Sequence, residues 1–184
     1  MGLLYAAISF QLPLPHQLVL ISPGLNVEMN NPAMYDIAPY DPALSPEHCI
    51  LVNRLWAGGD PSLPVSPEDA ANPTINPIKG DISLLKNART PSPGELEVLT
   101  NTGMRVVLVS AGYDVLHPDT LVWLERAEAA GLQVHYIEGV RQIHDFPTGR
   151  KNIWEGKVVT DRIVEIVEAR SAELGFSKPR TIDV

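Results

Sequence analysis

Cysteine is almost missing from this chain, and positive charge is scarce. Cys49 is the single cysteine in 184 residues, so an internal disulfide is excluded and a reducing compartment is permitted. We therefore expect a cytoplasmic protein. Lysine and arginine number 14 against 22 acidic residues, which gives a formal net charge of −8. This acidic balance argues against a nucleic-acid partner or an anionic membrane surface, because few cations are available to neutralise phosphates.

Further absences narrow the function classes. No apolar run approaches the roughly 20 residues that a membrane span requires. No glycine-rich phosphate loop follows the first predicted strand, which removes nucleotides from consideration. The five histidines have none of the spacings that are typical of zinc sites. We therefore expect no metal and no other cofactor.

The clearest structural pattern in the sequence is a strand followed by a helix. Residues 106–109 are consecutive β-forming apolar residues, and Gly112 marks a sharp turn after them. Asp114 lies just past this predicted strand. A helix is predicted over residues 118–131, with proline in its first turn and glycine at its end. Its apolar residues at helical spacing are Leu121, Val122, Leu124 and Ala127.

A second strand is predicted over residues 133–137, and the loop after it contains His144. A strand, helix, strand unit of this length is a right-handed crossover between parallel strands. Both loops therefore open on the carboxyl edge of one sheet, where open α/β sheets carry their chemistry. We expect this topology to bring Asp114 and His144 close together.

An acid and a histidine in this arrangement are what a hydrolase needs to orient an imidazole. The carboxylate holds one ring nitrogen, and the other nitrogen takes a proton from a nucleophile. A solvated turn residue at Asp114 and an exposed loop histidine at His144 are the plainer alternatives. Their positions at equivalent ends of consecutive strands favour the functional interpretation.

Two segments here resemble a known family. Residues 111–119 (AGYDVLHPD) and 142–147 (QIHDFP) are similar to the acid and histidine motifs of the α/β-hydrolase fold-3 esterases, the hormone-sensitive-lipase-like group, especially its fungal members. Four upstream segments resemble that family in the same order: 18–23, 31–34, 41–45 and 75–83. The resemblance implies a mostly parallel sheet flanked by helices, forming the carboxyl-terminal part of an α/β-hydrolase fold. It also implies that Asp114 is the triad acid, that His144 is the triad base, and that the substrates are small or medium carboxylic esters.

The nucleophile of that family is missing. It lies in a G-x-S-x-G turn, which occurs nowhere in the 184 residues, and the HGG-type oxyanion motif is absent too. Ser22 has leucine in place of the first glycine, and Pro23 after it has no N–H for an oxyanion hole. Ser110 also has leucine in place of the first glycine, and it lies on the same strand end as Asp114. We expect the chain to begin inside the helix that leaves the nucleophile turn.

Two functions remain open on the sequence. One is a serine-type carboxylic ester hydrolase that needs a serine from elsewhere. The other is an inactive hydrolase-fold remnant that acts as a binding or interaction module, or a truncated gene model. The favoured expectation is that this chain alone is inactive. A sheet without its first strands would also present an unpaired edge for self-association.

The remaining segments are expected to support this partial domain, which spans residues 1–184. Residues 23–94 are rich in proline and should form cap-like loops and short helices, including a helix capped by Ser45 that buries Cys49. In the family such material lines the substrate pocket, so Trp56 is either a pocket wall or, as favoured, a core residue of that helix. Residues 89–95 are predicted to be a surface loop. A strand-helix-strand-helix unit is expected over 105–175, with a last helix over 152–174 and a frayed tail over 178–184.

Overall fold

The centre of the molecule is a parallel sheet of three strands. The computed structural model describes residues 1–87, 90–92, 95–100, 103–149 and 153–175; the expected frayed tail lies outside them. The strands are β1 (Gln17–Ile21), β4 (Arg105–Ala111) and β5 (Gln133–Gly139), in the order β1-β4-β5. Leu20 of β1 pairs with Leu108 of β4, which pairs with Tyr136 of β5, and all pairings are parallel. The predicted parallel crossover is confirmed.

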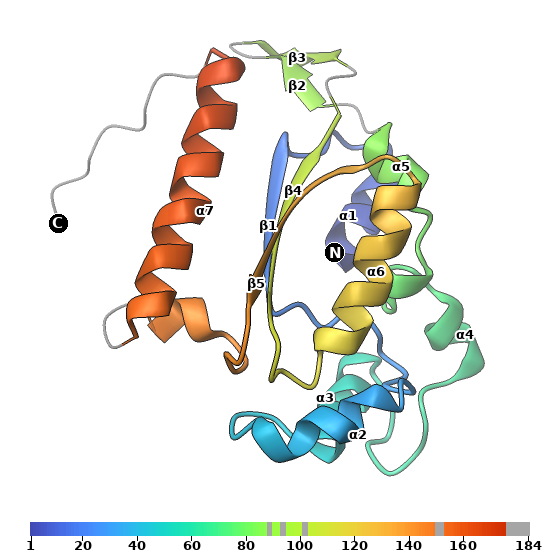
Figure 1. Ribbon diagram of the computed structural model, residues 1–184. Helices are drawn as coiled ribbons and strands as arrows, with labels where there is room; N and C mark the ends of the chain where they lie inside the picture. Colours follow the sequence, from blue (N-terminus) through green and yellow to red (C-terminus); the bar gives the residue numbers. More distant parts are fainter. Residues whose placement is uncertain (88–89, 93–94, 101–102, 150–152, 176–184) are drawn as a thin grey trace, which may run out of the picture.

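Helices cover both faces of this sheet (Figure 1). On one face lie α1 (Gly2–Ser9), α5 (Ile82–Lys86) and α6 (His117–Ala129), and on the other lies α7 (Trp154–Glu173). Strand β4 is buried on both sides because its side chains alternate between two cores. Val106 and Leu108 belong to a cluster with Trp123 of α6, whereas Val107 and Val109 belong to a cluster with Ile163 of α7.

Both long helices form where the sequence predicts them, but the inward face of α6 differs in part from the prediction, since only Leu124 and Ala127 of the expected four residues pack in the core. In α6 the residue that fills the core is Trp123, which is 0% exposed, while Leu121 and Val122 are exposed. In α7 the residues packed against the sheet are Val159, Ile163, Ile166 and Val167, and Trp154 at its first turn is exposed. Helical periodicity locates a stripe to within about one residue, and packing against the sheet decides which residues it contains.

Residues 23–87 form loops and short helices, as predicted. The elements are α2 (Ala33–Ile37), η1 (Ala38–Tyr40), α3 (Pro46–Trp56), α4 (Pro67–Ala71), η2 (Pro77–Lys79) and α5. Ser45 caps α3 as expected: its Oγ accepts a hydrogen bond from the His48 N–H at 3.2 Å. Cys49 is buried in a cluster with Met34 and Val115, and burial raises the pKa of its thiol to about 11. The expected core thiol is confirmed.

The surface loop predicted over residues 89–95 is wrong. Within the described residues, β2 (Thr90–Ser92) pairs antiparallel with β3 (Glu95–Thr100). Residues 95–100 contain Leu, Val and Thr in a short β-forming run. Pro91 lies in β2, which is an edge strand of this two-stranded sheet, and edge strands tolerate proline. The prolines favour an extended backbone, and what they did not reveal is that this extended segment pairs with a second strand. None of the described helices has the length and apolar character needed to cross a membrane.

Candidate active site

The two loops that follow β4 and β5 are hydrogen-bonded to each other at the carboxyl edge of the sheet. The Gly112 N–H donates to the Gly139 carbonyl at 2.9 Å, and the Tyr113 N–H donates to the Gln142 carbonyl at 2.9 Å. Because these are main-chain bonds, they fix the spacing of the loops independently of side-chain rotamers. Asp114 and His144 are carried on these two loops.

Gly139 makes room for the second loop to fold back over the strand end. A Cβ at this position would lie 2.5 Å from Cζ of Phe146 and 2.9 Å from Cβ of Gln142. Phe146 is buried under α7 and begins a single 3₁₀ turn, η3 (Phe146–Gly149). Close approach of the loop backbone to β5 therefore depends on the missing side chain at Gly139.

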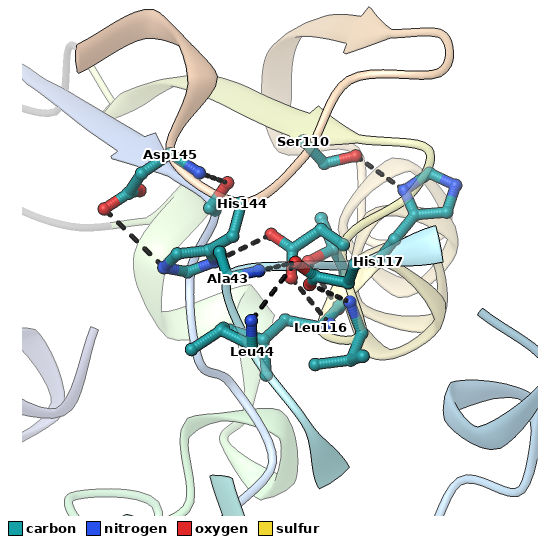
Figure 2. A network of polar contacts seen from close by, with 12 residues as sticks. Ala43, Leu44, Ser110, Leu116, His117, His144 and Asp145 are labelled. Atoms are coloured by element: carbon teal, nitrogen blue, oxygen red, sulfur yellow. Dashed lines mark hydrogen bonds and ion pairs between the residues drawn. The ribbon is translucent and has the colours of Figure 1, made fainter. Parts of the chain in front are cut away.

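Asp114 and His144 meet in this setting (Figure 2). The Oδ2 of Asp114 lies 3.0 Å from Nδ1 of His144, and its Oδ1 accepts the Leu116 N–H at 2.9 Å. The Asp114 side chain is only 1% exposed, whereas that of His144 is 21% exposed. A buried carboxylate thus holds one nitrogen of a ring that solvent can reach. The predicted proximity of the two residues is confirmed.

The surroundings of His144 favour its protonated form. Burial alone would lower the pKa of His144, but the hydrogen bond and charge of Asp114, with the charges of Asp145 and Asp41, outweigh it. The net effect is a pKa raised above the ordinary value of about 6.5. Its second nitrogen, Nε2, lies 3.6 Å from Oδ2 of Asp145. Both ring nitrogens therefore face carboxylates.

Asp41 is a supporting residue that the sequence pattern did not reveal. Its Oδ2 accepts the Val115 N–H at 3.1 Å, across a separation of 74 residues. Its Oδ1 accepts the Ala43 and Leu44 N–H groups at 2.9 and 3.2 Å. One buried carboxylate therefore joins the segment before α3 to the residue next to Asp114. The only sequence signal was the turn-forming tendency of an aspartate before proline.

Solved structures share this arrangement of strands and helices. A hormone-sensitive lipase from a metagenome library matches with a TM-score of 0.70 and 20% identity over 92% of this chain and 49% of that one. An esterase from the bacterial hormone-sensitive lipase family matches with a TM-score of 0.72 and 20% identity over 92% and 48%. An esterase/lipase from an uncultured bacterium gives 0.69 and 19% over 93% and 48%. The chain has an α/β-hydrolase fold.

This likeness concerns the fold alone, and it is partial. The chain spans about half the length of the solved esterases that it matches. No family model and no curated protein matches the sequence. The expected fold class is thus confirmed, while the activity of this hydrolase-fold chain has to be argued from its own residues.

The two serines considered as nucleophiles occupy other roles in the hydrolase fold. Ser22 follows β1, and its Oγ accepts the Asp145 N–H at 3.1 Å. Ser110 is buried in β4, with its Oγ 2.7 Å from Nδ1 of His117 and 3.0 Å from the hydroxyl of Tyr136. Neither hydroxyl hydrogen-bonds His144 among the described contacts. Both serines instead support loops around the acid and histidine.

His117 belongs to a polar cluster on the α6 face of the sheet. Figure 2 shows its contact with Ser110; in addition, its Nε2 lies 3.9 Å from Oε1 of Glu138. Burial lowers the pKa of His117 below its ordinary value, and the charges of Glu138 and Asp114 oppose this only in part. The His117 N–H also donates to the Asp114 carbonyl at 2.9 Å. His117 therefore anchors the loop that presents Asp114 and is not the partner of its carboxylate.

Trp56 does not pack in a core, contrary to the favoured interpretation. It is 70% exposed at the end of α3. It lines a hollow of about 260 Å³ together with Val52 and residues of the first turn of α1, and neither Asp114 nor His144 lines that hollow. Its role as a substrate-pocket wall stays a prediction.

Within the described ranges, no three His, Cys, Asp or Glu side chains gather as a metal site.

Proposed function

We propose that this chain supplies the acid and base of a serine-type carboxylic ester hydrolase. The observation that carries the proposal is the 3.0 Å contact between the buried Asp114 carboxylate and Nδ1 of the partly exposed His144. The fold shared with solved esterases and lipases supports the same reaction class. The resemblance of the two loops to fold-3 motifs of fungal type supports small or medium carboxylic esters as substrates.

Each residue has a defined part in this reaction. Asp114 fixes the ring orientation of His144 and stabilises the imidazolium that forms when the ring accepts a proton. The neutral ring takes the proton of a serine hydroxyl at Nε2 as the oxygen attacks the ester carbonyl, and then returns it to the leaving alcohol. The nucleophile turn and the oxyanion motif are absent from these 184 residues, so another segment has to supply the serine and the oxyanion donors. The isolated chain is therefore expected to be inactive.

A fluorophosphonate probe and p-nitrophenyl butyrate test this proposal. The 184-residue chain is compared with a product extended before Met1 by a segment that contains a G-x-S-x-G turn. We expect the extended product to be labelled and to hydrolyse the ester, and His144→Ala and Asp114→Asn to reduce hydrolysis by at least about 100-fold. His135→Ala, an exposed histidine on β5, serves as the control. An extended product that is inert, or whose hydrolysis survives His144→Ala, overturns the proposal.

A second function is favoured by two features of the surface, an exposed apolar face of α3 and an unpaired edge of β1. Four neighbouring side chains of α3 are exposed: Leu51, Val52, Leu55 and Trp56. Strand β1 pairs only with β4 among the described strands, so its other edge has no strand beside it. We propose as the alternative that the chain is a binding module that associates with a second copy of itself through this edge.

A further inference from the structure

In this site the contact between His144 and Asp145 involves the ring nitrogen that a catalytic histidine needs as its base. Asp114 holds Nδ1, so Nε2 is the nitrogen that must accept the hydroxyl proton. Oδ2 of Asp145 stands 3.6 Å from that nitrogen. The position in front of Nε2 is therefore already occupied by a carboxylate of the neighbouring residue (Figure 2).

The backbone of Asp145 is fixed in this position from both sides. Its φ is 54°, in the left-handed region that aspartate adopts more readily than most residues. Its N–H donates to Oγ of Ser22 at the end of β1. Its carbonyl accepts the Thr148 N–H at 2.9 Å and the Thr148 hydroxyl at 2.7 Å. The carboxylate consequently starts from a rigid backbone close to the ring, and only its side-chain torsions are free to move.

We propose that Asp145 is a positioning residue that caps Nε2 of His144 in the resting state, so that an incoming hydroxyl must displace its carboxylate before the ring can act as a base. This inference rests on the proposed function of His144. The charged groups that face the ring are Asp114 from the loop after β4, Asp41 from the segment before α3, and Asp145 from its own loop. Of the two side chains in the His144–Asp145 contact, that of Asp145 is the more exposed, at 47% against 21% for His144. It is therefore the one that can swing into solvent.

The cap has a chemical consequence that does not require turnover. An imidazole between two carboxylates retains its second proton to a higher pH than an isolated ring does, and a protonated ring cannot accept another. When Asp145 moves away, the Nε2 proton passes to solvent and the ring becomes a base with Nδ1–H held by Asp114. Removal of the Asp145 charge should therefore increase the neutral fraction of His144.

Two measurements on the 184-residue chain test the cap. Proton and nitrogen NMR titration of the His144 ring is recorded for the wild type, Asp145→Asn and Glu125→Gln. The last variant removes one negative charge from an exposed position in α6 and is the control. We expect the pKa of His144 to fall by roughly 0.5 unit in Asp145→Asn, as for a partly exposed ion pair, and to stay unchanged in the control. Carbethoxylation of His144 by diethyl pyrocarbonate at pH 7 should accelerate, by at most about threefold for a fall of this size, because it follows the neutral fraction.

Equal His144 titration curves for Asp145→Asn and Glu125→Gln overturn the inference. So does a carbethoxylation rate in Asp145→Asn that does not exceed the rate in the control. These readouts are separate from ester hydrolysis. An extended product without activity would remove the proposed function while leaving a measured shift in place, and an active product with no shift would remove only the cap.

Discussion

At the scale of single residues, the site depends on buried carboxyl groups. Such groups are tolerated only when hydrogen bonds and an opposite charge replace the water that they lose. Asp114 has the Leu116 N–H on one oxygen and His144 on the other. The protonation state of His144 should therefore be coupled to folding.

The sign of this coupling gives a prediction for Asp114→Asn. The folded pKa of His144 lies above its unfolded value, so its pairing with Asp114 stabilises the fold fully below about pH 6.5 and less as the pH rises through the folded pKa. The variant should lose about 1–3 kcal/mol of unfolding free energy at pH 6, and the loss should shrink by pH 8.5. Urea unfolding at both pH values checks this. A loss that grows with pH would contradict it.

Asp41 supports the site through three main-chain hydrogen bonds, and this gives a second prediction. Asp41→Ala leaves the N–H groups of Ala43, Leu44 and Val115 without their acceptor, and the Val115 bond is buried. We expect a loss of about 2–3 kcal/mol in unfolding free energy. Asp36→Ala in α2, an exposed acid, should change it by no more than about 0.5 kcal/mol. Similar losses in both variants would exclude the proposed role of Asp41.

Individual residues differed in how far the sequence predicted them. Asp114 and His144 could be located because each follows a strand that the apolar pattern marks, and parallel topology does the rest. Asp41 and Ser22 could not, because their contacts cross 74 and 123 residues of chain. No local pattern encodes such pairs. Asp145 was visible only as a neighbour of the histidine, since its left-handed backbone is set by Ser22 and Thr148.

At the scale of elements, the loop after β5 is shaped by its contact with the strand end. Gly139→Ala places a methyl group against Phe146 and Gln142, and the aromatic ring is confined beneath α7. We expect a loss of about 1–3 kcal/mol in unfolding free energy and a lower pKa of His144, because the loop that carries this residue must shift from Asp114. Gly24→Ala is the matched control, since a Cβ there meets nothing within 4 Å. An unchanged His144 titration in Gly139→Ala would refute this account of the loop.

Helix α6 provides a test of which residues face the core. Trp123→Ala should cost about 3–5 kcal/mol of unfolding free energy, whereas Val122→Ala should cost about 0.5 kcal/mol because Val122 is exposed. Trp123→Phe should cost less than Trp123→Ala. The indole N–H is buried and has no hydrogen-bond partner among the described residues, so its loss carries no polar penalty. Thermal or urea unfolding of the three variants ranks them, and an equal cost for Val122→Ala and Trp123→Ala would contradict the assignment.

The positions of the helices were predictable from the sequence, whereas the residues of α6 that face the core were predictable only in part. Proline at the first turn and glycine after the end delimit α6 in the sequence. The buried tryptophan falls between Val122 and Leu124, where a shift of one residue rotates the stripe by about 100°. The strand pair β2 and β3 was missed for a different reason: the proline-rich sequence of residues 89–95 resembles that of an open loop.

At the scale of the whole molecule, helices cover both faces of the sheet, and among the described strands β1 pairs with β4 alone. The Arg105 N–H donates to the His16 carbonyl, and the Ser22 N–H donates to the Val109 carbonyl. Main-chain groups of a parallel strand alternate between its two sides, so even-numbered residues of β1 bond to β4. Val19 therefore directs its N–H and carbonyl toward the open edge, where a second copy of the chain could pair.

Val19→Pro tests pairing through this edge. Proline removes the outward N–H without removing a bond to β4, and an edge strand tolerates it. If copies associate through β1, sedimentation equilibrium should show a concentration-dependent dimer for the wild type that weakens about tenfold or more in Val19→Pro, since a lost edge pairing costs about 1.4 kcal/mol or more. Val19→Ala keeps the N–H and should keep the dimer, and circular dichroism of both variants confirms that the fold is retained. A dimer that persists in Val19→Pro would move the interface to the exposed apolar face of α3, and a monomer in all three proteins would exclude self-association.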